Sequence, residues 1–447
     1  PTPAPTPPAQ RVTETSGLTD PANPKLTTSE INAMSLALVD PSMSPPDGPG
    51  GTLFFSAGDY WIQAMEEADL DPAMRTSPYA VSNANVVNHW AQGGIQIRPG
   101  VSYIGEPGTR LLWSETLESD HDEMNPNHNA TMFGAVSPFA WESSAYVDAV
   151  ITDTVLAGQR IFEVDSVTGF DIGDLVMLQL GYIPEDRPEF VWWTHATVID
   201  IDDESPYHIT LDHPAAIPVQ SLDFGDPDAE TAHLIRKLNR VVENIEIRNF
   251  ELLQNPEPDP NPEVAVIQPE TGIYFHYTRG TRAENLIATD VGAGAVVFQY
   301  CERGAVRNLH VKAATGSDYY GRCMSFANSR GITVDDVTLE NFRSVPVFSE
   351  LQSSQIRLRN LHLVNYNEDR AVGTTEGLLV TSFESTIDAE GLTVDGFGGY
   401  ALTYAAGNPP LGTNIFSVDN LFLRPLKKVG KCSGSGGGGG HPGVVVE

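Results

Sequence analysis

Cysteine is nearly absent from the sequence. The 447 residues include only three, Cys301, Cys323 and Cys432. Three cysteines are too few for a disulfide framework, and their spacing matches no zinc or redox motif. We therefore predict that Cys301 and Cys323 pack as small buried hydrophobes. Cys432 lies in a glycine-rich tail, where we expect its thiol to be exposed.

Long hydrophobic runs are absent as well. No apolar stretch approaches the roughly 18 residues that a membrane-spanning helix needs, so we expect no transmembrane segment. The chain also does not open with a basic segment followed by an apolar one. We therefore expect that any secretory signal has already been removed.

Basic residues are scarce relative to acidic ones. The chain has 26 Lys and Arg against 59 Asp and Glu, a formal net charge of −33. Residues 1–270 carry 11 basic and 42 acidic side chains, whereas residues 271–447 carry 15 and 17. An acidic surface repels polyanions at long range, which argues against nucleic acid as a partner. An acidic ligand is expected to bind the near-neutral C-terminal half.

Glycine and proline are abundant, with 40 and 33 residues, and they separate short apolar segments. "GGTLFFSAGDYWI" (residues 50–62) and "GGIQIRPGVSYIGEPGTRLLW" (residues 93–113) each read as short strands joined by tight turns. Strands of four to six residues between glycine turns are typical of all-β proteins. The sequence therefore predicts an all-β fold.

A strand phrase recurs after residue 241, as in "VRNLHV" and "LRNLHL". From Asn285 onward its turn residues are spaced by 23, 28, 24, 31 and 29 positions, after a first gap of 41. Such periods predict a solenoid in which each repeat is one coil of a parallel β-helix, stacked about 4.8 Å from the next. The predicted turn residues are Asn244, Asn285, Asn308, Asp336, Asn360, Gly391 and Asn420.

The remaining segments differ in composition from these coils. Alternating apolar and polar residues between 147 and 220 predict an inserted β subdomain, either a small antiparallel barrel or a pair of hairpins. We predict a Pro-rich N-terminal arm (1–27), an N-terminal part of the β-helix (28–146), this insertion (147–220), the main coils (221–426) and a flexible Gly-rich tail (427–447).

The strand-and-turn opening, followed by coils of the "NIEIRNF" type, resembles the pectate-lyase-like right-handed parallel β-helix superfamily over residues 28–425. The insertion "GFDIGDLVML" looks like a β insertion found in bacterial and phage members. The resemblance implies a single-stranded right-handed parallel β-helix with an inserted antiparallel unit. The superfamily includes polysaccharide lyases, glycoside hydrolases, epimerases and phage tailspikes, so the resemblance is specific for fold and not for reaction.

Three Arg-Gly pairs recur at about one-coil spacing. Arg279, Arg303 and Arg330 are 24 and 27 residues apart, and we predict that they form a ladder at one corner of the coils. Guanidinium groups match carboxylate geometry, so a ladder would suit an anionic polysaccharide. The alternative is structural, with each arginine bonding turn carbonyls and each glycine permitting the corner.

A polar cluster between two repeats supplies the groups that a β-elimination needs. Such a reaction requires a cation to neutralise the uronate carboxylate, a base for the C5 proton and an acid for the leaving oxygen. We predict catalytic roles for Tyr319, Tyr320, His310, Lys312 and Arg322, and substrate binding by His276, Tyr277, Tyr300 and the three arginines. The alternative is that the tyrosines cover apolar surface and that the histidine and lysine are merely solvated.

The loop "ESDHDEMNPNHNAT" is rich in oxygen ligands. Asp120, Asp122, Asn125 and Asn127 are candidates for binding Ca²⁺, although the loop lacks the glycine and terminal glutamate of an EF-hand. The alternative is a solvated acidic loop. Ca²⁺ is the one cofactor that the sequence suggests.

From these features we expect a secreted, extracellular or cell-surface protein that acts on an acidic, uronate-containing polysaccharide as a lyase. The first alternative is a non-enzymatic structural, appendage or tailspike-like subunit that binds polysaccharide. The second is a glycoside hydrolase, which would use two carboxylates, and no pair stands out. The terminal arms leave open a homo-oligomer or filament.

Overall fold

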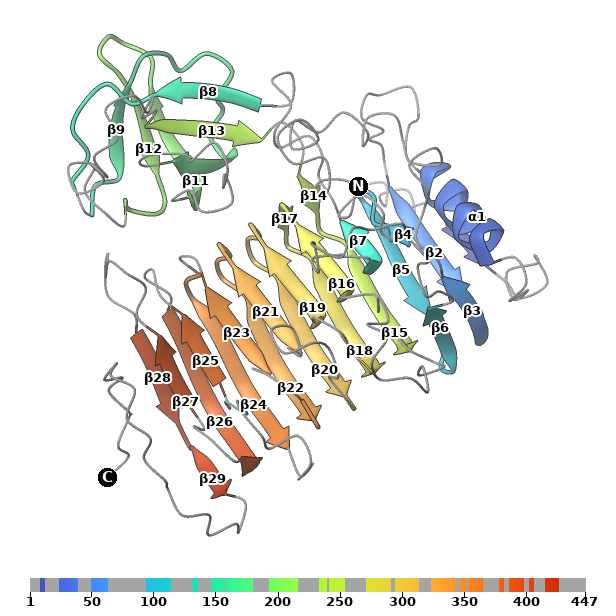
Figure 1. Cartoon of the computed structure of the whole chain (residues 1–447). Coiled ribbons are helices and arrows are strands. Elements are labelled where there is room, and N and C mark those ends of the chain that lie inside the picture. Colours follow the sequence, from blue (N-terminus) through green and yellow to red (C-terminus); the bar gives the residue numbers. More distant parts are fainter. Residues whose placement is uncertain are drawn as a thin grey trace, which may run out of the picture.

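The fold is built almost entirely from strands (Figure 1). Across the residues that are described, there are 29 strands and a single helix. No helix in this part of the chain is long and apolar enough to cross a membrane. The computed structural model describes residues 9–12, 24–38, 50–62, 94–113, 131–135, 146–156, 158–179, 193–215, 233–238, 241–253, 271–290, 294–312, 323–342, 346–350, 353–364, 378–381, 386–397, 402–405 and 415–425.

Two parallel sheets form the walls of a solenoid, which confirms the predicted β-helix. The larger of the two, with 13 strands, is called sheet 1, and the smaller, with eight strands, is called sheet 2. Each main coil contributes one strand to each sheet, and every pairing between coils is parallel. The main strands of sheet 1 are β15 (Glu246–Leu253), β18 (Arg282–Thr289), β20 (Ala305–Val311), β22 (Thr333–Glu340), β24 (Ile356–Val364), β26 (Thr386–Phe397) and β28 (Ile415–Asp419). Those of sheet 2 are β16 (Thr271–His276), β19 (Gly294–Gln299), β21 (Met324–Ala327), β23 (Val347–Glu350), β25 (Leu378–Thr381) and β27 (Leu402–Ala405).

The N-terminal coil extends both sheets and is covered by the helix. Helix α1 (Pro24–Leu36), which the sequence did not predict, lies beside the first strands in Figure 1. The Asn32 side chain donates to the Gly94 carbonyl at 2.9 Å and accepts from the Gln96 amide at 2.8 Å. The helix therefore covers one end of the solenoid, as terminal caps do in repeat proteins. The strands here are β1 (Ala9–Val12), β2 (Gly51–Phe55), β3 (Gly58–Ile62), β4 (Ile95–Gln96), β5 (Val101–Gly105), β6 (Thr109–Trp113) and β7 (Thr131–Ala135).

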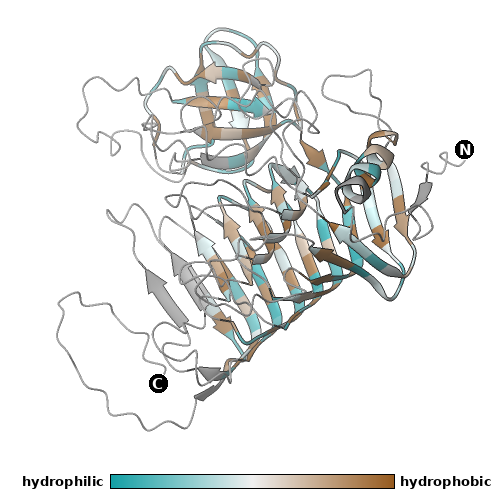
Figure 2. Cartoon of the chain, turned by 45° about the vertical axis from the view of Figure 1, so that its right-hand side comes forward, coloured by the Kyte–Doolittle hydropathy of each residue, from teal (hydrophilic) through white to brown (hydrophobic). Residues whose placement is uncertain are grey.

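The core runs between the two sheets as columns of like side chains. Phe275, Phe298 and Phe326 come from three successive coils, with ring centroids 5.0 and 6.1 Å apart. Each is fully buried, and burying such a side chain contributes roughly 1.5–3 kcal/mol. Cys301 and Cys323 are also fully buried, as predicted. Figure 2 shows the resulting alternation of apolar and polar residues along the coil strands.

The turn residues of the repeat all adopt the left-handed backbone region. Asn285, Asn308 and Asn360 have φ between 48° and 53°, which asparagine tolerates better than most residues. Asn308 Nδ2 donates to Asn285 Oδ1 at 2.9 Å, so these side chains also link successive coils. In the first coil the equivalent residue is Asn249, because Phe250 pairs with Leu286. The assignment of Asn244 to this column was therefore wrong.

The insertion is a closed antiparallel barrel above one corner of the coils (Figure 1). Its sheet runs in the order β8-β13-β10-β11-β12-β9, and an antiparallel bridge between Ile151 and Val164 closes it. The last strand pairs with both β8 and β10, so the barrel continues past the predicted boundary at residue 220. The strands are β8 (Tyr146–Val150), β9 (Ile161–Val164), β10 (Leu175–Gln179), β11 (Trp193–Asp202), β12 (Tyr207–Leu211) and β13 (Leu234–Leu238).

Candidate functional site

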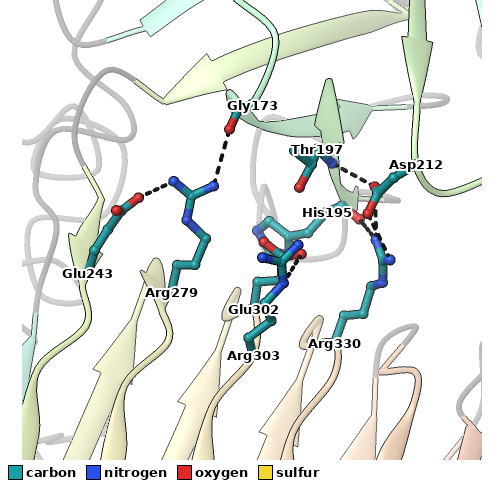
Figure 3. A network of polar contacts seen from close by, with 9 residues as sticks. All are labelled: Gly173, His195, Thr197, Asp212, Glu243, Arg279, Glu302, Arg303 and Arg330. Carbon is teal, nitrogen blue, oxygen red and sulfur yellow. Dashed lines mark hydrogen bonds and ion pairs between the residues drawn. The ribbon is translucent and has the colours of Figure 1, made fainter. Parts of the chain in front are cut away.

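A polar network joins the barrel to the coil corner beneath it (Figure 3). Arg330 donates through Nη1 and Nη2 to the two carboxylate oxygens of Asp212, at 3.2 and 3.1 Å. Its Nη1 also donates to the His195 carbonyl at 3.2 Å. Arg279 forms an ion pair with Glu243 on the neighbouring coil and donates to the Gly173 carbonyl at 3.4 Å. Two of the three predicted substrate-binding arginines thus contact the barrel.

The three arginines do not stack in one column. The backbones of Arg279 and Arg330 both lie in parallel β-register with Glu302 of the coil between them. The column therefore consists of Arg279, Glu302 and Arg330. The residue after this column must adopt the left-handed backbone region at the corner. Gly280 and Gly331 occupy that position in the coils on either side of the middle one. In the middle coil Arg303 itself fills it, with φ of 58°. The prediction that Arg303 aligns with Arg279 and Arg330 was therefore wrong by one residue, because Glu302 takes that position.

Charge at this corner is balanced between the barrel and the coils. Burial raises the pKa of the Glu302 carboxyl, while nearby Arg303 and Arg330 oppose that rise. Burial also acts to raise the pKa of the Asp212 carboxyl. The hydrogen bonds from Arg330 and the Thr197 amide, together with the positive charge of Arg330, outweigh burial and hold this pKa below its usual range. Arg303 contacts Glu302 at 3.3 Å and keeps 61% of its side chain exposed. Its guanidinium remains open to solvent.

The predicted aromatic residues lie beneath the barrel. Tyr277 and Tyr300 are buried and stack at 4.8 Å with an interplanar angle of 8°. His276 lies 4.3 Å from the Tyr277 ring, and its pKa falls to about 3 because of burial and the nearby His195. This placement makes the tyrosines part of the packed corner between the coils and the barrel.

His195, Asp212 and Glu243 belong to this corner and were not among the residues predicted from the sequence, and His195 has the most buried position of the three. Its Nδ1 lies 3.0 Å from the Asn328 carbonyl, and since a carbonyl only accepts, Nδ1 carries the hydrogen. Burial lowers the pKa of His195 to about 4, and the charge of Arg330 adds to the effect. The imidazole is neutral at ordinary pH. A histidine within an alternating strand gives no signal that its partner is a coil turn far along the chain.

A second group of predicted residues lies at the other end of β20. His310 and Lys312 are at the C-terminal end of this strand, on the outer side of sheet 1, since Leu309 and Val311 point into the core. His310 Nε2 lies 3.1 Å from Glu340 Oε1 on the neighbouring coil, and both side chains are more than a third exposed. Lys312 is exposed. Glu340 is not among the residues predicted from the sequence.

The predicted residues therefore fall into two groups rather than one cluster. Arg303 and His310 are seven residues apart along a single coil, and the left-handed turn residue Asn308 lies between them. His276, Tyr277, Tyr300 and the three arginines lie at or near the barrel corner. The candidates Tyr319, Tyr320, Arg322, Asp120, Asp122, Asn125 and Asn127 lie outside the described residues.

No cluster of three His, Cys, Asp or Glu side chains suited to a metal occurs among the described residues. The Ca²⁺ loop proposed from the sequence is not among them. Its four oxygen ligands therefore remain a prediction.

A row of alternating charges crosses the outer face of sheet 1. We call it the charge row. Its members pair in register, strand by strand, directly before each turn residue. The sequence carries this signal in the residue that precedes each turn asparagine, aspartate or glycine, a pattern that was not among the predictions. The alternating row consists of Arg248, Glu284, Arg307, Asp335, Arg359 and Glu390. The next strand places a second acidic residue, Asp419, in register with Glu390, so the alternation ends there.

Ion pairs within the charge row are loose. Arg307 Nε lies 3.6 Å from Asp335, and Arg359 Nε lies 4.0 Å from Glu390. The two arginine side chains are 58% and 52% exposed. Exposed pairs of this kind contribute about 0–1 kcal/mol, so their guanidinium groups can turn to another anion at little cost.

Comparison with known proteins finds likeness in structure but not in sequence. No protein-family profile matches the sequence, and no curated protein does. The tailspike protein gp49 of Pseudomonas phage LKA1 superimposes with a TM-score of 0.52 at 12% identity, over 88% of this chain and 56% of that one. This chain thus spans little more than half the length of that tailspike.

Two further solved structures match with lower scores. The gp54 tailspike of Acinetobacter baumannii bacteriophage AP22, solved in complex with an A. baumannii capsular saccharide, gives 0.31 at 10% identity, over 84% of this chain and 66% of that one. The A-module of the Azotobacter vinelandii mannuronan C-5 epimerase AlgE6 gives 0.23 at 11% identity, over 89% and 96%. The coil topology and the likeness to gp49 together show that the chain has a right-handed parallel β-helix fold.

Proposed function

We propose that the protein binds an acidic polysaccharide along the outer face of sheet 1 and cleaves it by β-elimination beside His310. The contact that carries this proposal is the 3.1 Å approach of His310 Nε2 to Glu340, with the exposed Lys312 directly after the end of the strand that carries His310. An imidazole next to a carboxylate suits proton transfer. Hydrolysis would instead call for two carboxylates flanking the bond.

The roles follow from the chemistry of elimination. Lys312 neutralises the uronate carboxylate, which makes the C5 proton more acidic. His310 removes that proton, and Glu340 orients the imidazole and stabilises its protonated form. Tyr319 and Tyr320 follow Lys312 closely in the sequence, and a phenol at either position would protonate the leaving oxygen. Such a polysaccharide would be met outside the cell, in keeping with an extracellular or cell-surface protein.

The barrel corner supports a ligand-binding role less well than sheet 1 does. Arg330 and Arg279 already have carboxylate partners at that corner, and Tyr277 and Tyr300 are buried. Arg303 alone of the three keeps most of its side chain exposed. Substrate is therefore assigned to the face that carries the charge row.

A second candidate is a polysaccharide-binding appendage subunit without catalytic activity. The likeness to the gp49 tailspike favours it, because that match covers 88% of this chain. Both candidates predict binding of an acidic glycan. Only the enzyme predicts that the glycan is shortened and gains an unsaturated sugar.

The test is an elimination assay by ultraviolet absorbance on acidic polysaccharides, comparing wild type with His310→Ala. Loss of the general base is expected to slow elimination by about 10²–10⁴-fold. Arg160→Gln, which alters an exposed side chain of the barrel, serves as the control and should leave the rate unchanged. An unaltered rate in His310→Ala would refute the assignment of the base. Binding without any elimination would favour the appendage subunit.

A further inference from the structure

We propose that the polysaccharide bound on sheet 1 carries a carboxylate on every second sugar, as in a polymer of uronate alternating with N-acetylhexosamine. This inference rests on the proposed function and specifies its substrate class. It comes from the sign pattern of the charge row.

Cationic side chains recur on every second coil of that row. Arg248, Arg307 and Arg359 lie on β15, β20 and β24, with one coil between each pair. Successive coils are about 4.8 Å apart, so successive arginines are spaced by roughly 10 Å. The intervening coils present Glu284 and Asp335 at the same position.

This spacing discriminates between two kinds of acidic glycan. A sugar residue in an extended chain is about as long as one coil step, so a glycan lying along the row meets one coil per sugar. A carboxylate on every second sugar would face an arginine each time. A carboxylate on every sugar would also face Glu284 and Asp335, and the resulting like-charge contacts oppose binding.

The acidic members of the row suit the sugars in between. Carboxylate oxygens only accept hydrogen bonds. A neutral N-acetylhexosamine offers hydroxyl and amide hydrogens to such acceptors. The alternating polymer therefore matches both signs of the row, whereas a homopolymer of uronate matches one.

Arg307 and Arg359 are held less tightly by their acidic neighbours than Arg330 is at the corner, whereas Arg248 lies 3.4 Å from Glu246. The contacts of Arg307 and Arg359 with their acidic neighbours, at 3.6 and 4.0 Å, are longer than hydrogen bonds. Arg330, in contrast, makes two hydrogen bonds to Asp212 and is only 14% exposed.

The row also lies next to the proposed base. Arg307 and His310 belong to the same strand, on either side of the turn at Asn308, and Leu309 between them is buried. A glycan held by the row would pass beside His310 and Glu340. Binding and cleavage would thus use adjacent positions of the same coils.

The experiment compares binding of the full chain to four glycans by isothermal calorimetry at low salt. Heparosan and hyaluronan carry a carboxylate on every second sugar, and alginate and polygalacturonate carry one on every sugar. We expect at least about tenfold tighter binding of the alternating pair. The double variant Arg307→Gln, Arg359→Gln should lose roughly tenfold in affinity for them, and the control Arg160→Gln, at an exposed arginine of the barrel, should lose none.

A complementary variant tests whether the acidic side chains of the charge row repel a polymer with a carboxylate on every sugar. Glu284→Gln with Asp335→Asn should improve binding of alginate or polygalacturonate several-fold, while circular dichroism confirms an unchanged fold. Equal or tighter binding of the homopolymers by wild type would overturn the inference and leave the proposed function intact. Failure of all four glycans to bind would overturn the proposed function together with it.

Discussion

Arg330 of the coils and Asp212 of the barrel form a two-pronged ion pair, with both guanidinium terminal nitrogens within 3.2 Å of the carboxylate. The two residues are 118 positions apart in the sequence. Arg330 also holds the His195 carbonyl, and the His195 ring bonds to the Asn328 carbonyl two residues before Arg330. This group of contacts is the main polar attachment between the barrel and the coils among the described residues.

Breaking the ion pair between Arg330 and Asp212 should lower the free energy of unfolding. Asp212→Asn leaves Arg330 only partly compensated, and we expect a loss of about 2 kcal/mol in the free energy of unfolding, measured by urea titration. Arg110→Gln disrupts the exposed pair with Asp59 and should cost less than about 1 kcal/mol. Equal costs for the two variants would contradict the special role of Arg330 and Asp212.

Acid should destabilise the same interface. The pKa of His195 is about 4 in the folded chain against its ordinary value of 6.5, so between these values the unfolded chain binds a proton that the folded chain does not. Stability is therefore complete above pH 6.5 and falls as the pH drops toward 4. His276, with a pKa of about 3, acts in the same direction.

Replacing one histidine tests that dependence. His195→Gln keeps a side chain that can donate to the Asn328 carbonyl but cannot titrate. Urea unfolding between pH 4 and 7 should show a shallower fall in stability for the variant than for wild type. Identical slopes would mean that protonation of His195 is not coupled to unfolding.

The left-handed turn residues are expected to be sensitive to a β-carbon without a polar group. Asn308 has φ of 48° and bonds Asn285 across the coil interface. Asn308→Ala loses the bond and strains the backbone, at a cost of about 2 kcal/mol. Asn308→Gly loses only the bond and should cost about half as much in the same urea titration. A glycine variant less stable than the alanine variant would contradict this account.

The carboxylate next to the proposed base should affect turnover more than binding. Glu340→Gln keeps the size of the side chain but removes the charge near His310 Nε2. We expect kcat for elimination to fall by about tenfold, with KM little changed. An increase in KM at constant kcat would instead assign Glu340 to substrate binding.

The coils could be predicted from the sequence because the same local pattern of turn and strand residues repeats in each coil. A residue must enter the left-handed region at one turn, and Asn285, Asn308 and Asn360 recur there between alternating apolar residues. The strand interiors are equally regular. Local patterns of this kind need no knowledge of distant partners.

The attachments of the barrel could not be predicted in this way. Pairing of Arg330 with Asp212, and of β13 with β8, joins segments whose separation in the sequence says nothing about their contact. The register of Arg303 was also hidden, because two adjacent residues were equally plausible for the corner. Helix α1 gave only a weak periodic signal, because its buried face includes the polar residues Thr28, Asn32 and Ser35.

The most direct test of the account is the structure of the reaction product. Heparosan digested by the full chain should yield fragments with an unsaturated sugar at the non-reducing end, detected by nuclear magnetic resonance, and His310→Ala should yield none. Saturated fragments would show hydrolysis, and intact polymer that binds the protein would show a role in attachment. Either result would contradict elimination at His310.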